Sequence, residues 1–591
     1  GANSVERDMV GLTELSAANG GDEVFRRLIE LGIALSAERD HDRLQEMILL
    51  EAKRICNADG GTLYILTEDE KGLAFAIMRN DTLDIAKGGT TGIEIPFPPL
   101  SLIRPDGAPN YSNVATAVAL TKTTVNIPDA YEETSTFDFS GTIAFDKQTN
   151  YRSMSFLTVP LTTRQDSLIG VLQLINARDG QGNVVPFSPN IQPVIEALSS
   201  QAAVAIDNEI LLRSQRELLD SFIELMAGSI DAKSAYTGGH CQRVPLVTEL
   251  LAKAACESSE GIYADFDLNE EEWYELHLAG WLHDCGKVAT PEYVVDKATK
   301  LETIYNRVHE IRMRFEVLRR DAEIDMWKKK ARGEGDDATL EAAFDARCQD
   351  LDASFALIAE TNIGGEFLDD ETAARVREMG KQTWTRHFDR SLGLSWEESN
   401  RLPEGVVMAG PAEERLLDDR PDHLTGEYNL GELYNLSIQR GTLTAEEREK
   451  INDHIRITIS MLEQLPFPKT LKRVPEIAGG HHEKMDGTGY PNRLTRDQMS
   501  LPARMMAIAD IFEALTASDR PYKKAKKLSE CIRIMSFMKK DSHIDPDLFD
   551  LFLKAGVWKE YAERFLDPDQ IDDVDISVYL DDPVVSAAQL S

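Results

Sequence analysis

Apolar positions follow two different periodicities along the chain, and the change falls near residue 210. In the first segment, apolar residues recur at helical spacing from Phe25 to Leu35, and a polar interruption at 39–42 separates this predicted helix from its continuation toward Leu49. Short apolar runs then predict strands, and a long helix is expected from about 191 to 219 and onward. The predicted strands cover 61–66, 73–78, 155–161 and 169–176. This segment is therefore expected to be an α+β domain with an antiparallel sheet flanked by helices.

From about residue 225 to 560, the pattern predicts helices almost throughout. Within this stretch, residues 302–437 are unusually rich in charge, and apolar residues recur at helical spacing between the charges from Ile304 to Leu318. We expect this part to be a helical hairpin that projects from an all-α domain. The sequence after Glu560 is acidic, and we expect it to be loosely packed.

These patterns divide the chain into a multidomain arrangement. The expected parts are an N-terminal tail (1–21), an α+β domain (22–210), a linker helix (211–224), the first part of an all-α domain (225–301), a charged helical insertion (302–437), the second part of the all-α domain (438–560) and an acidic C-terminal tail (561–591). At 591 residues the chain is too long for a single hydrophobic core, which agrees with several domains. A continuous linker helix would suit pairing with its copy in a homodimer.

Composition narrows the class of partners. The formal net charge of −37 argues against binding to DNA, which requires a basic surface. An anionic substrate would need local cations to overcome this charge, and bound metal ions would supply them best. The six cysteines show no C-x-x-C spacing, so we interpret them as reduced thiols of a cytoplasmic protein. No apolar run reaches about eighteen residues, so we expect no membrane span.

The most informative stretch is 480–491, with the sequence GHHEKMDGTGYP. Imidazole is a strong ligand for divalent transition metals, and glycines allow the backbone to approach a phosphate closely. His481 and His482 cannot share one helical face, so a helix must end here if both rings meet one metal centre. The glycines and Pro491 that follow would end it.

Three other motifs carry ligand-type side chains. They are His240 in YTGGHCQRV (236–244), His283 and Asp284 in LHDCGK (282–287), and Asp510 in ADIFEALT (509–516). His454 follows a predicted helix start in which Thr444 is the cap and Glu447 the third residue. A single histidine is more often a structural residue than a ligand, but several in such motifs reverse those odds. We interpret the remaining histidines as surface or packing residues: His41, His277, His309, His387, His423 and His543.

The first segment resembles a GAF domain, a small-molecule-binding sensor module. The resemblance is carried by VNIPDAY (125–131), TNYRSMS (149–155), VPL (159–161) and GVLQLIN (170–176). It implies the GAF fold and a small-molecule ligand of unknown identity. An active sensor and a purely structural or dimerising module are both compatible with these residues.

The motifs of the second half resemble an HD-GYP domain, a branch of the HD phosphohydrolases, over 225–301 and 438–540. The resemblance implies two divalent metal ions, iron or manganese, with Asp284 as the bridging carboxylate. The first metal would be held by His240, His283, Asp284 and Asp510, and the second by His454, His481 and His482. His309 lies at a family-like distance after the HD pair, but His454 has the family's Leu-Thr-x-x-Glu sequence before it, so we assign the ligand there.

The same resemblance implies roles around the metals. Lys287 would act with Asp284 in catalysis and neutralise a substrate phosphate oxygen, and Arg520 would be a second basic contact. Gly489 and Tyr490 would shape the loop beside the substrate, where Tyr490 would either contact a guanine or serve in packing. Arg243, three residues after His240 and on the same side, and Glu483 would support the ligands. Some family members carry a glutamate four residues before the first histidine for a third metal. Tyr236 stands there in this chain, so we expect two metals rather than three.

The resemblance implies a GAF-regulated phosphodiesterase that hydrolyses cyclic di-GMP to linear pGpG, or onward to GMP, with a hydroxide activated by two metals. One alternative is a catalytically slow receptor or protein-interaction module that uses the insertion. Another is a phosphodiesterase for a different cyclic dinucleotide, such as cyclic GMP-AMP.

Overall fold

A computed structural model describes residues 21–132, 137–233, 239–518 and 524–580. The chain divides into two compact units with the boundary between Leu219 and Asp220. This boundary lies inside helix α6 (Gln192–Lys233), which continues past residue 219 as the sequence predicts. None of the helices in the described ranges is long and apolar enough to cross a membrane.

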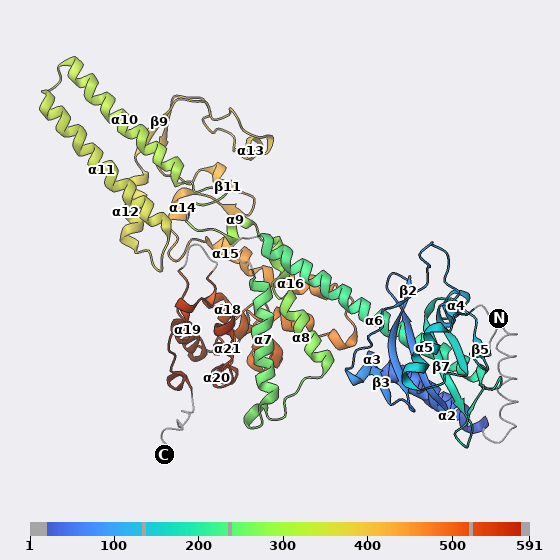
Figure 1. Cartoon of the computed structure of the whole chain (residues 1–591). Coiled ribbons are helices and arrows are strands. Elements are labelled where there is room, and N and C mark those ends of the chain that lie inside the picture. The colour runs from blue at the N-terminus through green and yellow to red at the C-terminus, as the bar shows by residue number, and fades with distance from the viewer. Residues whose placement is uncertain (1–20, 133–136, 234–238, 519–523, 581–591) are drawn as a thin grey trace. The chain divides into compact units, whose positions relative to one another are not determined.

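The first unit is built on one antiparallel sheet (Figure 1). Its main strands lie in the order β3-β2-β1-β7-β6-β5, while β4 pairs with β2 and β8 with β7. The strands are β1 (Ala58–Leu66), β2 (Gly72–Asn80), β3 (Ile85–Gly88), β4 (Leu100–Ser101), β5 (Val125–Ile127), β6 (Phe156–Thr162), β7 (Leu168–Arg178) and β8 (Val184–Val185). The α+β prediction for this segment is therefore confirmed.

Helices cover the sheet because their apolar residues form a core on each of its faces. One core joins α3 (His41–Cys56) and α6 to the sheet and includes Leu44, Leu63 and Leu198. The other joins α4 (Val114–Thr121) to the opposite face and includes Val118, Phe156 and Val171. The remaining helices are α2 (Gly21–Ala37) and α5 (Ser140–Thr149). The predicted break between the first two helices is confirmed, since α2 ends at Ala37 and α3 begins at His41.

The second unit is mainly helical. Apart from residues 302–437, its helices are α7 (His240–Glu257), α8 (Glu270–Leu282), α9 (Glu292–Val295), α15 (Ala445–Asn452), α16 (His454–Glu463), α17 (Val474–Gly479), α18 (Leu501–Thr516), α19 (Leu528–Lys540), α20 (Pro546–Lys554) and α21 (Val557–Phe565). Thr444 and Glu447 form a capping box at the start of α15, as the sequence predicts.

Residues 302–437 contain the predicted helical hairpin, formed by α10 (Val308–Arg332) and α11 (Asp337–Ile363) (Figure 1). Phe315 and Phe355 pack across it, with ring centroids 5.3 Å apart. The prediction of a purely helical insertion is incomplete, because two small antiparallel sheets are also present. The other elements are α12 (Asp370–Gly380), β9 (Thr383–Arg386), α13 (Trp396–Arg401), β10 (Ala412–Arg415), β11 (Leu424–Thr425), β12 (Tyr428–Asn429) and α14 (Glu432–Leu436).

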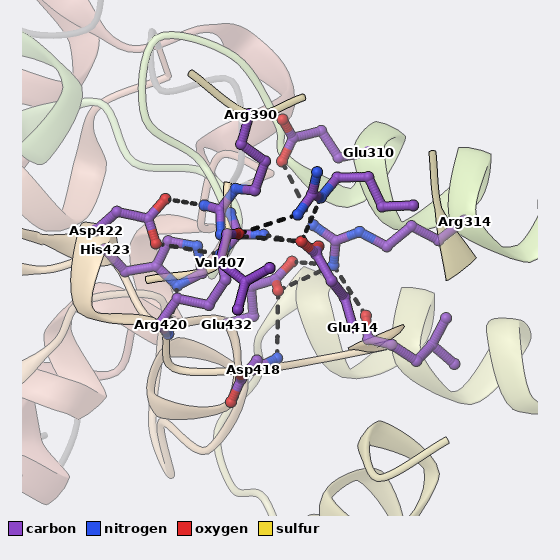
Figure 2. A network of polar contacts seen from close by, with 12 residues as sticks. Glu310, Arg314, Arg390, Val407, Glu414, Asp418, Arg420, Asp422, His423 and Glu432 are labelled. Carbon is purple, nitrogen blue, oxygen red and sulfur yellow. Dashed lines mark hydrogen bonds and ion pairs between the residues drawn. The ribbon is translucent and has the colours of Figure 1, made fainter. Parts of the chain in front are cut away.

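A network of buried and half-buried charges joins these parts of the insertion (Figure 2). Arg314 on α10 donates to both carboxylate oxygens of Glu432 on α14, at 2.7 and 2.9 Å. Arg390 donates to Asp422 at 2.6 Å, and the guanidinium of Arg386 donates to Glu414. We refer to these residues together with Arg420 and His423 as the insertion network. Each carboxylate named here has a cationic partner.

The acidic C-terminal segment is anchored to the helices at several positions as far as Leu580, so the prediction of loose packing is wrong at these positions. Tyr561 is buried in the core of the helical unit. The side-chain amide of Gln570 donates to the carbonyls of Thr516 and Lys526, and the carboxylate of Asp572 accepts from Ser529. Apolar and hydrogen-bonding contacts therefore outweigh the acidic character of this segment.

Candidate metal centre

The HD pair lies at a break between two helices. Helix α8 ends at Leu282, His283 caps it, and Asp284 precedes a short 3-10 helix, η3 (Cys285–Ala289), rather than continuing α8. Gly286 follows, and a Cβ there would overlap the carbonyl oxygen of His454. Glycine thus allows α16, which carries His454, to approach the HD pair closely.

The two adjacent histidines lie just beyond the end of α17 at Gly479, so the predicted helix ending is confirmed. The chain then folds back on itself. Gly489 packs so closely on Glu483 that a Cβ would overlap the Glu483 backbone. Both carboxylate oxygens of Glu483 accept backbone hydrogen bonds, from Asn492 at 2.7 Å and Leu494 at 2.9 Å. Glu483 therefore fixes the loop rather than the rings of the ligand histidines.

The structure brings all seven predicted ligand residues together in two adjacent groups. The first group is His240, His283, Asp284 and Asp510, and the second group is His454, His481 and His482. Within each group, one ligand-type atom per residue lies within 4.8 Å of the others. In the first group, Nε2 of His240 lies 3.0 Å from Oδ1 of Asp510.

Asp284 faces both groups with different oxygens. Its Oδ2 lies 3.2 Å from Nε2 of His240 and 3.2 Å from Nε2 of His283. Its Oδ1 lies 3.3 Å from Nε2 of His454 and 3.6 Å from Nε2 of His481. This is the placement expected of a carboxylate shared by two cations.

In three of the ligand imidazoles, Nδ1 lies against a backbone carbonyl, and Nε2 points toward Asp284. In His283 and His481, Nδ1 lies 2.6 Å from the carbonyl oxygen of Gly280 and 2.7 Å from that of Ala478. In His454, it faces the carbonyl of Ile451. A hydrogen bond at Nδ1 fixes the proton there and leaves Nε2 free as a metal ligand.

Two of these Nε2 atoms provide a test of whether a metal fits. Nε2 of His454 and Nε2 of His481 are fully buried and have no hydrogen-bond partner within the part of the chain that the structure describes. A buried polar atom without a partner is costly, and a cation facing it would remove that cost. The donor set, with five imidazoles and two carboxylates, suits a transition metal of the iron or manganese type. The residues present therefore fit a pair of divalent cations.

The charges of the centre shift the pKa values of its members. Burial alone would lower the pKa of His283, but the carboxylates of Asp284 and Asp510 overcome it and raise this pKa to about 9. Burial alone would raise the pKa of Asp284, yet His283 and Lys287 hold it well below its usual range. Burial, reinforced by the neighbouring His481, lowers the pKa of His482. The centre therefore keeps its carboxylates ionised.

The structure describes some of the residues predicted to contact the substrate, but not all of them. Nζ of Lys287 lies 2.7 Å from Oδ2 of Asp284, across the break after α8 rather than along one helical face. The ring of Tyr490 stacks on His482, with centroids 5.0 Å apart, and its hydroxyl lies 3.0 Å from Nδ1 of His482. Tyr490 thus contacts a ligand side chain. Arg520 and Tyr236 lie outside the described residues.

Glu513, which lies three residues after Asp510 on α18, is a residue of the centre that the sequence motifs do not predict. Its side chain is buried, faces Nδ1 of His240 and accepts from Nε of Arg243 at 2.8 Å. The Asp-x-x-Glu spacing on one helix was the available signal, but nothing in the sequence pairs Glu513 with residues some 270 positions earlier. His309 lies on the exposed start of α10 beside Arg312 and belongs to neither ligand group.

Two protein families match parts of the chain. A family model described as GAF domain matches residues 40–206, and one described as HD domain matches residues 421–548. The second match includes His454, His481, His482 and Asp510, but not the HD pair or His240. Among solved structures, the GAF domain of an Acinetobacter phosphoenolpyruvate-protein phosphotransferase matches 32% of this chain and 96% of its own, at 14% identity and a TM-score of 0.23.

Several curated proteins are similar to part of this chain. "Cyclic di-GMP phosphodiesterase PA4108" of Pseudomonas aeruginosa is 48% identical over 115 residues, which is 20% of this chain and 27% of that protein. "3'3'-cGAMP-specific phosphodiesterase 3" and "3'3'-cGAMP-specific phosphodiesterase 1" of Vibrio cholerae are 40% and 42% identical, over 20% and 29% of this chain and 24% and 35% of their own lengths. The matches thus span roughly a quarter to a third of these relatives. Together, the comparisons identify a GAF domain in the first unit of this chain and an HD domain in the second.

Proposed function

We propose that this chain is a metal-dependent phosphodiesterase for a cyclic dinucleotide, with cyclic di-GMP as substrate and linear pGpG as product. One observation carries the proposal: two groups of mostly buried ligand side chains converge on the two oxygens of Asp284, in a chain whose relatives bear cyclic dinucleotide phosphodiesterase names. When bound, a pair of iron or manganese ions would supply Lewis acidity toward phosphoryl oxygens and lower the pKa of a water molecule.

The protein's own residues would hold and orient the reacting groups. His240, His283, Asp284 and Asp510 would hold one cation, and His454, His481 and His482 the other, with Asp284 shared. Lys287 is partly exposed beside Asp284, so its ammonium group can neutralise a phosphate oxygen at the centre. Together with the two cations, this positive charge would locally counter the net charge of −37, which would otherwise repel an anionic substrate.

A variant of Lys287 can distinguish a role in catalysis from a role in metal binding. We expect Lys287→Met to keep both cations but to lower kcat by about 100-fold, because one charge-assisted contact to the phosphate is lost. Turnover of cyclic di-GMP by the manganese-loaded variant, with metal content counted on the same sample, checks this. Unchanged kcat would remove Lys287 from the mechanism.

A second candidate substrate is 3'3'-cGAMP, since two of the relatives reported above carry that name. The chemistry at phosphorus would be the same, and only base recognition would differ. The proposal is tested by comparing kcat/KM for cyclic di-GMP and 3'3'-cGAMP on protein loaded anaerobically with Fe(II) or Mn(II). Linear product from cyclic di-GMP supports the proposal, and product from 3'3'-cGAMP alone changes the substrate. Tight binding of either without product would make the protein a receptor.

The same proposal includes regulation of the phosphodiesterase activity by the GAF domain and formation of a homodimer through α6. Exposed apolar residues on α6 recur every seven positions, at Val204, Leu211, Leu218 and Leu225. A seven-residue repeat of this kind is typical of a helix that pairs with another helix in a coiled coil. We expect Leu211→Glu combined with Leu218→Glu to convert a dimer into a monomer in sedimentation velocity. A wild-type monomer would contradict the dimer.

A further inference from the structure

Glu513 contacts the ring of the ligand residue His240 with a charged side chain, and no other described ligand histidine has such a contact at Nδ1. On α18, its carboxylate is 1% exposed and faces two residues of α7. One oxygen, Oε2, pairs with Nδ1 of His240. The other, Oε1, accepts from both Nε and a terminal nitrogen of Arg243, each at 2.8 Å.

The other ligand imidazoles are supported differently. His283, His454 and His481 each have Nδ1 against the backbone carbonyl three residues earlier, which the local chain supplies without help from elsewhere. His482 has Nδ1 against the hydroxyl of Tyr490, within its own loop. Only His240, among the ligand residues described, relies on a charged side chain from a distant helix. The orientation of its ring therefore depends on the packing of α7 against α18.

We propose that Glu513, held by Arg243, is a positioning residue that fixes His240 for cation binding in the first ligand group and leaves the second group unaffected. This inference rests on the metal-dependent function proposed above. A carboxylate at Nδ1 keeps the proton on that nitrogen and directs the lone pair of Nε2 toward Asp284 and Asp510. His454, His481 and His482 have their own partners, so they do not need Glu513.

The test is calorimetric titration of the whole chain with Mn²⁺. In Glu513→Gln, an NH₂ group replaces one of the two carboxylate oxygens. Because Arg243 donates to Oε1 and requires an acceptor there, the NH₂ group must face Nδ1 of His240. The proton of the imidazole then moves to Nε2, which can no longer bind a cation. We expect the affinity for one Mn²⁺ to fall by about 10- to 100-fold, while the affinity for the other stays unchanged.

A rescue variant distinguishes positioning from simple damage. In Glu513→Gln combined with Arg243→Leu, the amide is free to turn its oxygen toward Nδ1, so part of the lost affinity should return. Glu275→Gln is the matched control. Glu275 is also a buried glutamate paired with an arginine, Arg473 at 2.9 Å, but it belongs to neither ligand group. We expect both cations to bind this variant as they bind the wild type.

Three outcomes would overturn the inference: wild-type binding of both cations by Glu513→Gln, equal weakening of both cations, or no recovery in the double variant. If Glu513→Gln fails to fold, Arg243→Leu alone serves, and it should weaken one cation by less than tenfold and spare the other. A wild-type protein that binds two cations but hydrolyses no cyclic dinucleotide would refute the proposed function and leave this inference standing. A wild-type protein that binds no Mn²⁺ would refute both.

Discussion

Two clusters of buried ionisable side chains lie in the helical unit, and they differ in how their polar atoms are satisfied. In the insertion network, carboxylates and guanidinium groups pair with each other, as Arg314 does with Glu432 and Arg390 with Asp422. In the metal centre, Nε2 of His454 and Nε2 of His481 are buried without a hydrogen-bond partner in the described chain. A closed network stabilises a fold, whereas buried ligand atoms that lack hydrogen bonds and converge on one carboxylate fit a bound cation.

The largest expected effect comes from Asp284, the carboxylate that both ligand groups share. Asp284→Ala should abolish turnover, by more than about 1,000-fold, and leave fewer than two Mn²⁺ per chain, because one oxygen is lost from each group. Metal counting and a hydrolysis assay on the same sample check this. The matched control is Asp422→Ala in the insertion network, which should keep both cations. Wild-type turnover by Asp284→Ala would remove the centre from catalysis.

The next largest effect is on the stability of the insertion rather than on metal binding. Arg314→Met leaves the buried carboxylate of Glu432 without its cation, so local unfolding of the insertion should become easier by about 3–5 kcal/mol. Hydrogen exchange of peptides from α10 and α14 measures this. Replacing both partners, in Arg314→Met with Glu432→Leu, should recover most of the loss. If Arg314→Met instead lowered metal binding and left hydrogen exchange of the insertion unchanged, the insertion network and the metal centre would not be independent.

A pH effect is expected at His423 in the insertion network. Burial, together with the nearby charge of Arg420, lowers the pKa of His423 to about 4 from a usual value near 6.5. Between these two values the unfolded chain binds a proton that the folded chain does not, so stability is lost as the pH falls from 6.5 toward 4. The loss is at most about 3 kcal/mol.

His423→Gln should remove this part of the acid sensitivity. The measurement is hydrogen exchange of the insertion at pH 6.5 and at pH 4.5, in wild type and variant. The backbone N–H of Arg420 donates to Nδ1 of His423, which agrees with an unprotonated ring. An equal response of both proteins to acid would show that His423 is already protonated in the folded state.

The smallest expected effect concerns the hydroxyl of Tyr490. Tyr490→Phe removes the partner of Nδ1 in His482 but keeps the stacked ring, so the affinity for one Mn²⁺ should fall by about tenfold. Calorimetric titration should assign this loss to the second ligand group, the opposite group from that affected by Glu513→Gln. If both variants weakened the same cation, the division into two groups would be incorrect.

Much of the candidate centre could be predicted from the sequence, because its residues sit in short motifs whose chemistry is local. The helix ending before His481 and the capping box before His454 follow from neighbouring residues alone. The pairing of Glu513 with His240 could not be predicted, since it depends on how α18 packs on α7. Strands β9 and β10 were missed because TWTR and AEER lack an apolar alternation.

In the fold, too, features set by neighbouring residues could be predicted, and features set by packing between distant segments could not. The apolar runs that predict four strands of the first unit are local patterns, and these strands are present as β1, β2, β6 and β7. The helical hairpin predicted in the insertion is present as α10 and α11. The acidic C-terminal segment was expected to be loose because of its charge, but its few apolar and amide side chains decide its packing. The domain boundaries, the ligand of the GAF domain, the cytoplasmic location and the absence of DNA binding remain predictions.

The central claim is that two cations share Asp284. The most direct test is an anomalous difference map from crystals of the whole chain loaded with Mn²⁺. We expect two peaks about 3.5–4 Å apart, one beside His240, His283 and Asp510 and the other beside His454, His481 and His482, with one oxygen of Asp284 directed at each. A single peak, or no peak among these residues under conditions that support turnover, would contradict the account.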